Sequence, residues 1–253
     1  MNFESVKEIA KMIDHSLLHP TMTDRELTEG MEIAKKYDVA SVCIKPYAVK
    51  MAKEFLDGSD VLVGTVIGFP HGNSAIDIKV AETRQACEDG AVEIDMVVNI
   101  GKVMSEEYKY VEEEIKAVVD ESHRHNAITK VIFENDYLED KHIIKLCEIC
   151  TRVGAEFVKT SSGYGFVKGS DGKYSYEGAT IPDLKLMRQN SGAEVQVKAA
   201  GGVRSLDDLL KVKEVGVTRV GATATIAILE DAKKRLGEKF DESAVKGSSP
   251  AGY

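Results

Sequence analysis

Apolar runs and amphipathic stretches alternate along most of this chain. The apolar runs are short and rich in β-forming residues, and most are followed by a longer stretch with the apolar spacing of a helix. These runs are predicted strands at residues 39–45, 61–69, 91–99, 128–135, 156–162, 194–202 and 218–223, with a shorter candidate at 12–18. Strand and helix alternating in this way predict βα units and a parallel sheet.

The number of these units predicts a closed barrel. Eight units within about 235 residues favour a single α/β domain, a (β/α)₈ TIM barrel, which typically needs about 250 residues. An open doubly wound sheet is the alternative, but the sequence contains neither a G-x-G-x-x-G nor a Walker A motif. We assign residues 1–236 to the barrel with an N-terminal helix, and 237–253 to a flexible C-terminal tail.

A weak internal repeat supports the barrel. Three predicted helices end in glycine and lead directly into a strand, in "DGAVEID", "VGAEFVK" and "VGVTRVG". Asp95, Lys159 and Gly221 each follow the glycine by five residues. Equal offsets place these positions at similar heights, toward the strand ends where barrel enzymes carry their chemistry.

Lys159 interrupts an apolar strand, where an unpaired ammonium group is costly. One interpretation is a structural salt bridge. The other is a lowered pKa, which gives a neutral amine that can form a Schiff base with a carbonyl. Lys198 in "VQVKAAGG" lies on the next predicted strand, about 4.8 Å away in a sheet. Two neighbouring lysines with Asp95 at the same level favour catalysis.

Asp95 also has two interpretations. It can be the counter-ion of the lysines, or it can transfer the protons that Schiff-base formation requires. Both roles can hold at once.

Glycine-rich segments follow three consecutive predicted strands, at residues 161–165, 200–204 and 221–225. Glycine permits close backbone approach, and N–H groups at helix starts bind phosphate. In barrels, phosphate sites commonly lie at the last βα loops. We therefore predict a phosphate site that includes Gly163, Gly201, Gly202, Gly221 and Thr223.

Composition narrows the choice of partners. The net charge of −9 argues against nucleic acid or an anionic membrane as the main partner. No apolar run of 18 residues occurs, and the N-terminus has no signal-peptide core, so we expect a cytoplasmic protein with reduced cysteines.

Cys147 and Cys150 have C-x-x-C spacing but lie on a predicted apolar helix face, which favours burial over redox chemistry. The charged run 111–125 is interpreted as a solvated helix face.

The motifs "MIDHSLLHP", "VCIKPYAV", "VIGFPHGN", "EIDMVVN", "FVKTSSGYG", "VKAAGGVR" and "RVGAT" resemble those of the deoxyribose-phosphate aldolases, in the same order and along nearly the whole chain. The resemblance implies a (β/α)₈ barrel and a class I aldolase without metal or cofactor. It also implies cleavage of 2-deoxy-D-ribose 5-phosphate to glyceraldehyde 3-phosphate and acetaldehyde, in nucleoside catabolism.

The resemblance also implies roles for individual residues. Lys159 would be the Schiff-base lysine, Lys198 the partner that lowers its pKa, and Asp95 the proton-transfer carboxylate. The substrate pocket would be lined by Asp14, Cys43 and Thr160. Some relatives end in a tyrosine that reaches the active site, which implies a proton-relay role for Tyr253. A homodimer is the candidate assembly.

Several positions depart from the family pattern. Asn135 and Asp136 replace residues that are usually Thr and a small residue, Thr223 and Ala224 stand where serines are common, and the loop 166–178 is longer than in the shortest relatives. Two alternatives stay open. One is a Schiff-base barrel aldolase for another sugar phosphate or ketoacid, and the other is a sugar-phosphate-binding regulator, which would not need both lysines.

Overall fold

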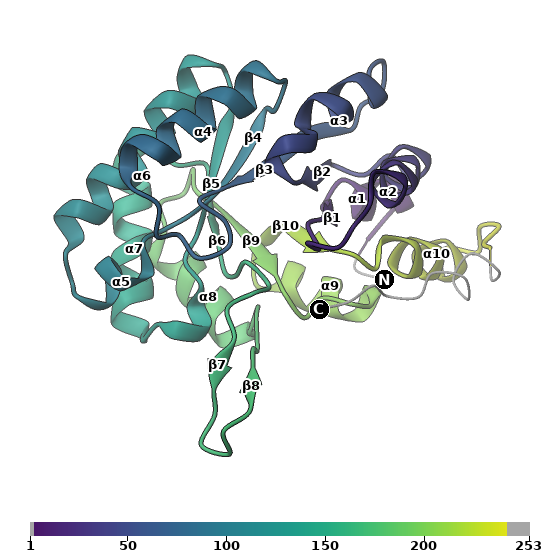
Figure 1. The fold of residues 1–253 in the computed structure, drawn as a ribbon. Helices are drawn as coiled ribbons and strands as arrows, with labels where there is room; N and C mark the ends of the chain where they lie inside the picture. The colour runs from purple at the N-terminus through teal and green to yellow at the C-terminus, as the bar shows by residue number, and fades with distance from the viewer. Residues whose placement is uncertain (1–2, 242–253) are drawn as a thin grey trace.

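A computed structural model describes residues 3–241 and shows a closed barrel of parallel strands (Figure 1). Around the barrel the strands follow the order β1-β10-β9-β6-β5-β4-β3-β2. Their bounds are β1 Ile13–Leu17, β2 Ser41–Ile44, β3 Leu62–Ile67, β4 Glu93–Val97, β5 Ile128–Ile132, β6 Phe157–Lys159, β9 Gln196–Ala200 and β10 Val217–Ala222. Every predicted strand is confirmed. Because these strands close into a barrel, the open doubly wound sheet is excluded.

Helices connect the strands and cover the outside of the barrel (Figure 1). They are α1 Val6–Ala10, α2 Asp24–Lys36, α3 Val49–Phe55, α4 Ile76–Glu88, α5 Ile100–Met104, α6 Tyr108–Arg124, α7 Asp140–Val153, α8 Ile181–Asn190, α9 Leu206–Glu214 and α10 Thr225–Arg235, with 3₁₀ turns η1 Pro46–Ala48 and η2 Asn135–Tyr137. Within residues 3–241, no helix is both long enough and apolar enough to span a bilayer.

Local sequence signals explain where several helices begin and end. Thr23 caps α2 with a complete capping box, and Ser205 caps α9. Gly90, Gly154 and Gly216 have φ values of +110°, +80° and +93°, in the left-handed region that favours glycine. The three equivalent glycines therefore end their helices and lead into β4, β6 and β10, as predicted.

The charged run 111–125 is not wholly solvated, so that interpretation is wrong in part. Glu114 and Glu121 of α6 are buried, at 0% and 2% exposure. Glu114 pairs with the buried Lys79 of α4, with 2.7 Å between Nζ and Oε1. The sequence pattern missed this pair because Lys79 and Glu114 lie 35 residues apart. Cys147 and Cys150 are buried on α7, as expected.

The long loop after β6 forms a β-hairpin that projects from the rim of the barrel (Figure 1). Its strands are β7 Val167–Lys168 and β8 Tyr174–Ser175, paired antiparallel. At the base of the hairpin, the Asp136 carboxylate accepts hydrogen bonds from the backbone N–H of Glu177 at 2.6 Å and of Gly178 at 3.1 Å. Two departures from the family pattern, the acidic residue and the longer loop, are therefore in direct contact.

Candidate active site

Two lysines and one carboxylate meet inside the barrel. Lys159 ends β6 and lies in register with Lys198 of β9. Asp95 of β4 accepts a hydrogen bond on Oδ2 from each, at 2.8 Å from Lys159 Nζ and 2.7 Å from Lys198 Nζ. All three residues are buried. The structure therefore brings together the three residues that the sequence analysis selected, and one carboxylate oxygen bridges both amines.

The surroundings shift the pKa values of the two lysines in opposite directions. Burial, the largest cause, lowers the pKa of Lys159, and the charge of Lys198 lowers it further while Asp95 opposes both. Burial also opposes the charged form of Lys198, but Asp14 and Asp95 outweigh it and raise its pKa. Of the two lysines, the surroundings therefore favour the neutral amine at Lys159 and the ammonium form at Lys198.

Asp14 of β1 is a buried ion-pair partner of Lys198. Its side chain is fully buried and is not among the residues that line the cavity. Asp14 Oδ2 lies 2.5 Å from Lys198 Nζ, and Oδ1 accepts a hydrogen bond from Ser41 Oγ at 2.7 Å. Asp14 is therefore an ion-pair partner of Lys198 outside the cavity lining, and its role toward the substrate stays a prediction.

Thr160 is also fully buried and outside the cavity lining. Its hydroxyl donates to the Ala200 carbonyl and accepts from the Ala200 N–H, both at 3.1 Å. Thr160 therefore joins the ends of β6 and β9, which carry the two lysines.

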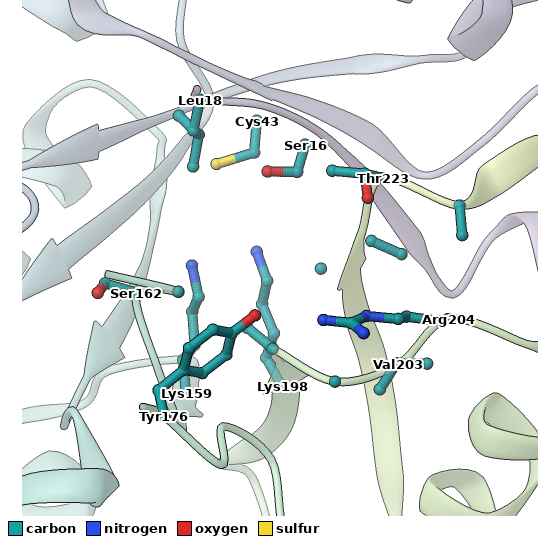
Figure 2. Close-up of a pocket in the computed structure, with 17 residues that line it drawn as sticks. Ser16, Leu18, Cys43, Lys159, Ser162, Tyr176, Lys198, Val203, Arg204 and Thr223 are labelled. Atoms are coloured by element: carbon teal, nitrogen blue, oxygen red, sulfur yellow. The ribbon is translucent and has the colours of Figure 1, made fainter. Parts of the chain in front are cut away.

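The lysine side chains point into a cavity at the carboxyl ends of the strands (Figure 2). The predicted phosphate-binding residues Gly163, Gly201, Gly202, Gly221 and Thr223 all line it, as does Cys43. Sequence reasoning missed other lining residues, among them Ser16, Leu18, Ser162, Tyr176 and Arg204. Arg204 directly follows the AGGV segment. A cation at a glycine-rich strand end suggests an anion site, and this pattern could have identified Arg204 from the sequence.

The walls of the cavity differ in polarity. Leu18 and Cys43 pack with Val66, and Phe69 packs against this small apolar cluster. Figure 2 shows Leu18 and Cys43 on one side of the lysines, with Arg204 and Thr223 on another. A substrate with one apolar end and one anionic end matches this division.

The backbone at the polar side has a glycine-specific conformation. Gly201 and Gly202 have φ values of +82° and +86°, which strain residues that carry a Cβ. They precede α9, whose N-cap Ser205 accepts a hydrogen bond from the Asp208 N–H, so the segment leads into the start of a helix. Such an exit binds anions.

The hairpin contributes one aromatic residue to the cavity. Tyr176 lines the cavity beside Gly201, and its ring packs edge-on against Phe166 with 5.4 Å between ring centroids. Figure 2 shows the Tyr176 hydroxyl lying on the same side of the cavity as Arg204. Because Asp136 holds the base of the hairpin, it also fixes where Tyr176 enters the site.

No group of three or more His, Cys, Asp and Glu side chains arranged to hold a metal occurs within residues 3–241. The predicted role of Tyr253 lies outside the described residues.

Comparison with known proteins identifies the family of this site. Residues 8–232 match the model described as DeoC/LacD family aldolase. The deoxyribose-phosphate aldolase of Rhodopirellula baltica is 49% identical over 242 residues, 96% of each chain, and that of Caldanaerobacter subterraneus is 46% identical over 92% of this chain and 96% of its own. The deoxyribose phosphate aldolase from Aeropyrum pernix, whose structure is described as tetrameric, superposes with a TM-score of 0.81 at 26% identity, over 91% of this chain and 93% of that one. The chain belongs to the DeoC/LacD family of aldolases.

Proposed function

We propose that this enzyme is a deoxyribose-phosphate aldolase that works through a Schiff base on Lys159. It would cleave 2-deoxy-D-ribose 5-phosphate to glyceraldehyde 3-phosphate and acetaldehyde, and catalyse the reverse reaction. The observation that carries the proposal is the bridge from Asp95 Oδ2 to both lysine amines, at the floor of a cavity that Lys159 and Lys198 line.

The geometry supports a defined sequence of proton transfers. The neutral Lys159 amine attacks the aldehyde carbon of the open-chain sugar and forms a carbinolamine. Asp95 takes a proton from the attacking amine, and the alkoxide takes a proton from solvent to complete the carbinolamine. Asp95 then returns its proton to the carbinolamine hydroxyl, which leaves as water and gives an iminium ion. Removal of the proton from the 3-hydroxyl then breaks the C2–C3 bond, releases glyceraldehyde 3-phosphate and leaves an enamine on Lys159. Protonation of the enamine carbon and hydrolysis release acetaldehyde and restore the free amine.

The two sides of the cavity suggest how the substrate lies. The anionic phosphate would bind at the side formed by Gly201, Gly202, Thr223 and Arg204. The two-carbon fragment would lie on Lys159 against the apolar wall that includes Cys43. This orientation places the bond that breaks between the Schiff base and the phosphate site.

The C-terminal Tyr253 would relay a proton to or from the enamine carbon. Tyr253 follows the last residue of α10 by 18 residues. A fully extended chain of this length spans up to roughly 60 Å, which is long enough for Tyr253 to return to the cavity. We expect Tyr253→Phe to lower turnover and to slow exchange of solvent deuterium into acetaldehyde, while Schiff-base trapping at Lys159 persists. Wild-type exchange and turnover in this variant would contradict the relay.

A coupled assay tests the proposed function. Glyceraldehyde 3-phosphate released from deoxyribose 5-phosphate is reduced by auxiliary enzymes, and oxidation of NADH is followed. Steady turnover supports the proposal. An aldolase for another sugar phosphate or ketoacid would turn over only its own substrate, and a regulator would bind the sugar phosphate without cleaving it.

The homodimer stays a prediction, to be checked by light scattering of the purified protein. Because the Aeropyrum pernix relative is described as a tetramer, a tetramer is the obvious competing result.

A further inference from the structure

A second layer of charged side chains lies beneath the active-site lysines. Glu93 and Arg219 precede Asp95 and Gly221 by two residues on β4 and β10, so they point to the same face, closer to the start of each strand. Lys130 of β5 lies in register with Asp95. Glu93, Lys130 and Arg219 are not among the residues that line the cavity.

This layer is tightly connected. Lys130 Nζ lies 3.0 Å from Asp14 Oδ2, 2.5 Å from Glu93 Oε2 and 3.3 Å from Asp95 Oδ1. Arg219 Nη1 lies 2.5 Å from Asp14 Oδ1 and 3.1 Å from Glu93 Oε1. Glu93 and Lys130 are each 1% exposed, and the Arg219 side chain is 14% exposed. The lower layer and the active site therefore form one continuous ion cluster that shares Asp14 and Asp95.

Counting the charges of the cluster gives an imbalance. Its carboxylates are Asp14, Glu93 and Asp95, and its cationic side chains are Lys130, Lys159, Lys198 and Arg219. With every group ionised, the cluster holds one positive charge in excess. An uncompensated charge in a buried site is costly, and loss of one proton removes it.

The contacts decide which group loses that proton. Arg219 cannot, because a guanidinium group stays protonated in proteins. Lys130 contacts three carboxylates and Lys198 contacts two, whereas Lys159 contacts only Asp95 among the carboxylates of residues 3–241 and also faces the cavity. Lys159 is therefore the least compensated cation of the cluster.

Other titratable groups around Lys159 do not change this result. The groups that face it are Asp95 on β4, Lys198 on β9, Cys43 on β2 and Glu134 after β5. Cys43 is a neutral thiol because burial raises its pKa to about 11. Burial, the largest cause, raises the pKa of Glu134, and within residues 3–241 its hydrogen-bond donors are the Ser162 backbone N–H and hydroxyl, not a lysine.

We propose that Arg219, Lys130 and Glu93 are positioning residues that set the charge count of the cluster, so that Lys159 is the cation that gives up its proton. The inference rests on the proposed Schiff-base role of Lys159. It assigns a catalytic consequence to side chains that never touch the substrate. Arg219 and Lys130 supply two of the three positive charges that balance the carboxylates, and the third is Lys198.

Variants of opposite sign test the proposal. Arg219→Met removes one cation and leaves three cations for three carboxylates, so Lys159 should hold its proton to higher pH. The isosteric Glu93→Gln removes one carboxylate and leaves four cations for two carboxylates, so Lys159 should lose its proton at lower pH. The double variant has three cations and two carboxylates, which restores the original excess of one.

The measurement is the pH dependence of Schiff-base trapping, with acetaldehyde and cyanoborohydride at saturating concentrations and the adduct on Lys159 quantified by mass spectrometry. We expect the midpoint to move up by roughly half a pH unit to one unit in Arg219→Met and down by a similar amount in Glu93→Gln. The double variant should return toward the wild-type midpoint. Arg235→Met is the matched control, because Arg235 forms ion pairs only with Asp207 and Asp231 among the described residues and lies on the outer helix α10.

Midpoints that stay at the wild-type value in folded Arg219→Met or Glu93→Gln would overturn the proposal, and so would shifts of the same sign in both. Unfolding of Arg219→Met leaves the test with the isosteric Glu93→Gln, whose predicted downward shift decides it. A purely structural role would weaken trapping in each single variant, and the double variant would not recover the midpoint. Absence of any adduct on Lys159 in the wild-type protein would instead contradict the proposed function.

Discussion

Lys159 and Lys79 are two of the buried lysines that lie next to a carboxylate, and a comparison of their surroundings shows how they differ. Lys159 lies in the barrel interior beside Asp95, and Lys79 lies between the helices α4 and α6 beside Glu114. The Lys159 side chain is 4% exposed and the Lys79 side chain 0%. Burial, the largest cause, lowers the pKa of both lysines. Burial and a shifted pKa therefore do not by themselves identify the catalytic lysine.

The hydrogen-bond partners separate the two sites. Lys79 Nζ donates to the Gly72 carbonyl, the Val97 carbonyl and Glu114 Oε1, each at 2.7 Å, which uses all three of its N–H groups. Lys159 Nζ donates to Asp95 and faces a cavity. These three acceptors make Lys79 a structural tie between the loop after β3, the end of β4 and helix α6. Among residues 3–241, Asp95 is the one hydrogen-bond acceptor of Lys159 Nζ, and the open space beside the amine leaves room for a reacting carbonyl.

The largest contrast should come from replacing each lysine by methionine. Lys159→Met should lower turnover by roughly 10⁴-fold or more, because it removes the nucleophile. Its melting temperature should stay close to wild type, since Asp95 keeps Lys130 and Lys198 as partners. Steady-state assays and thermal melts check both expectations. Turnover within tenfold of wild type would contradict the assignment.

The carboxylate partners provide the next contrast. Asp95→Asn should lower turnover by about 10²- to 10⁴-fold, because the amide cannot accept a proton. Glu114→Gln is the matched change outside the barrel, and its turnover per folded molecule should remain that of wild type. Equal losses of turnover in both variants would mean that Asp95 acts only as a counter-ion.

For folding stability, replacing Lys79 should matter more than replacing Lys159. Lys79→Met leaves Glu114 buried without its cation and should cost about 3–5 kcal/mol of folding free energy. Adding Glu114→Gln removes the stranded acid and should restore part of that loss. Denaturant unfolding measures both variants, with turnover per folded molecule as the control. A Lys79→Met protein as stable as wild type would show that the pair contributes nothing.

The smallest effect concerns the pH profile. Lys198→Met removes the neighbouring charge that holds the pKa of Lys159 down, so that pKa should rise by about one unit. Lys159 is reactive when deprotonated, so activity falls as pH drops through its pKa. The acid limb of the pH–rate profile should therefore move to higher pH. An unmoved limb with full activity would show that burial alone lowers the pKa of Lys159.

Much of this architecture could be predicted from local sequence patterns. Strand positions follow from apolar runs, and the glycine offsets select Asp95 and Lys159. The same reasoning passed over Lys130, although it too interrupts an apolar strand. The helix before Lys130 is followed by Asn126 with φ +57°, which has the left-handed conformation without being glycine. A search that accepts asparagine at this position would have included that strand in the repeat, but five residues after Asn126 comes Val131, so the fixed offset still misses Lys130 by one position.

Residues on loops could not be predicted in the same way. Arg204 and Tyr176 reach the cavity from segments whose direction depends on tertiary contacts. Asp136 anchors backbone groups 41 and 42 residues away, and no periodicity connects the two segments. Lys79 and Glu114 pose the same problem, because each looks like an ordinary surface charge in its own helix.

The most direct test of the account is to map where the Schiff base forms. The protein is incubated with acetaldehyde, reduced with borohydride, digested and analysed by mass spectrometry. The account predicts a single two-carbon adduct on Lys159, with Lys79, Lys130 and Lys198 unmodified because their ammonium groups are held by carboxylates or carbonyls. An adduct on Lys198 or Lys79, or an unmodified Lys159, would contradict it.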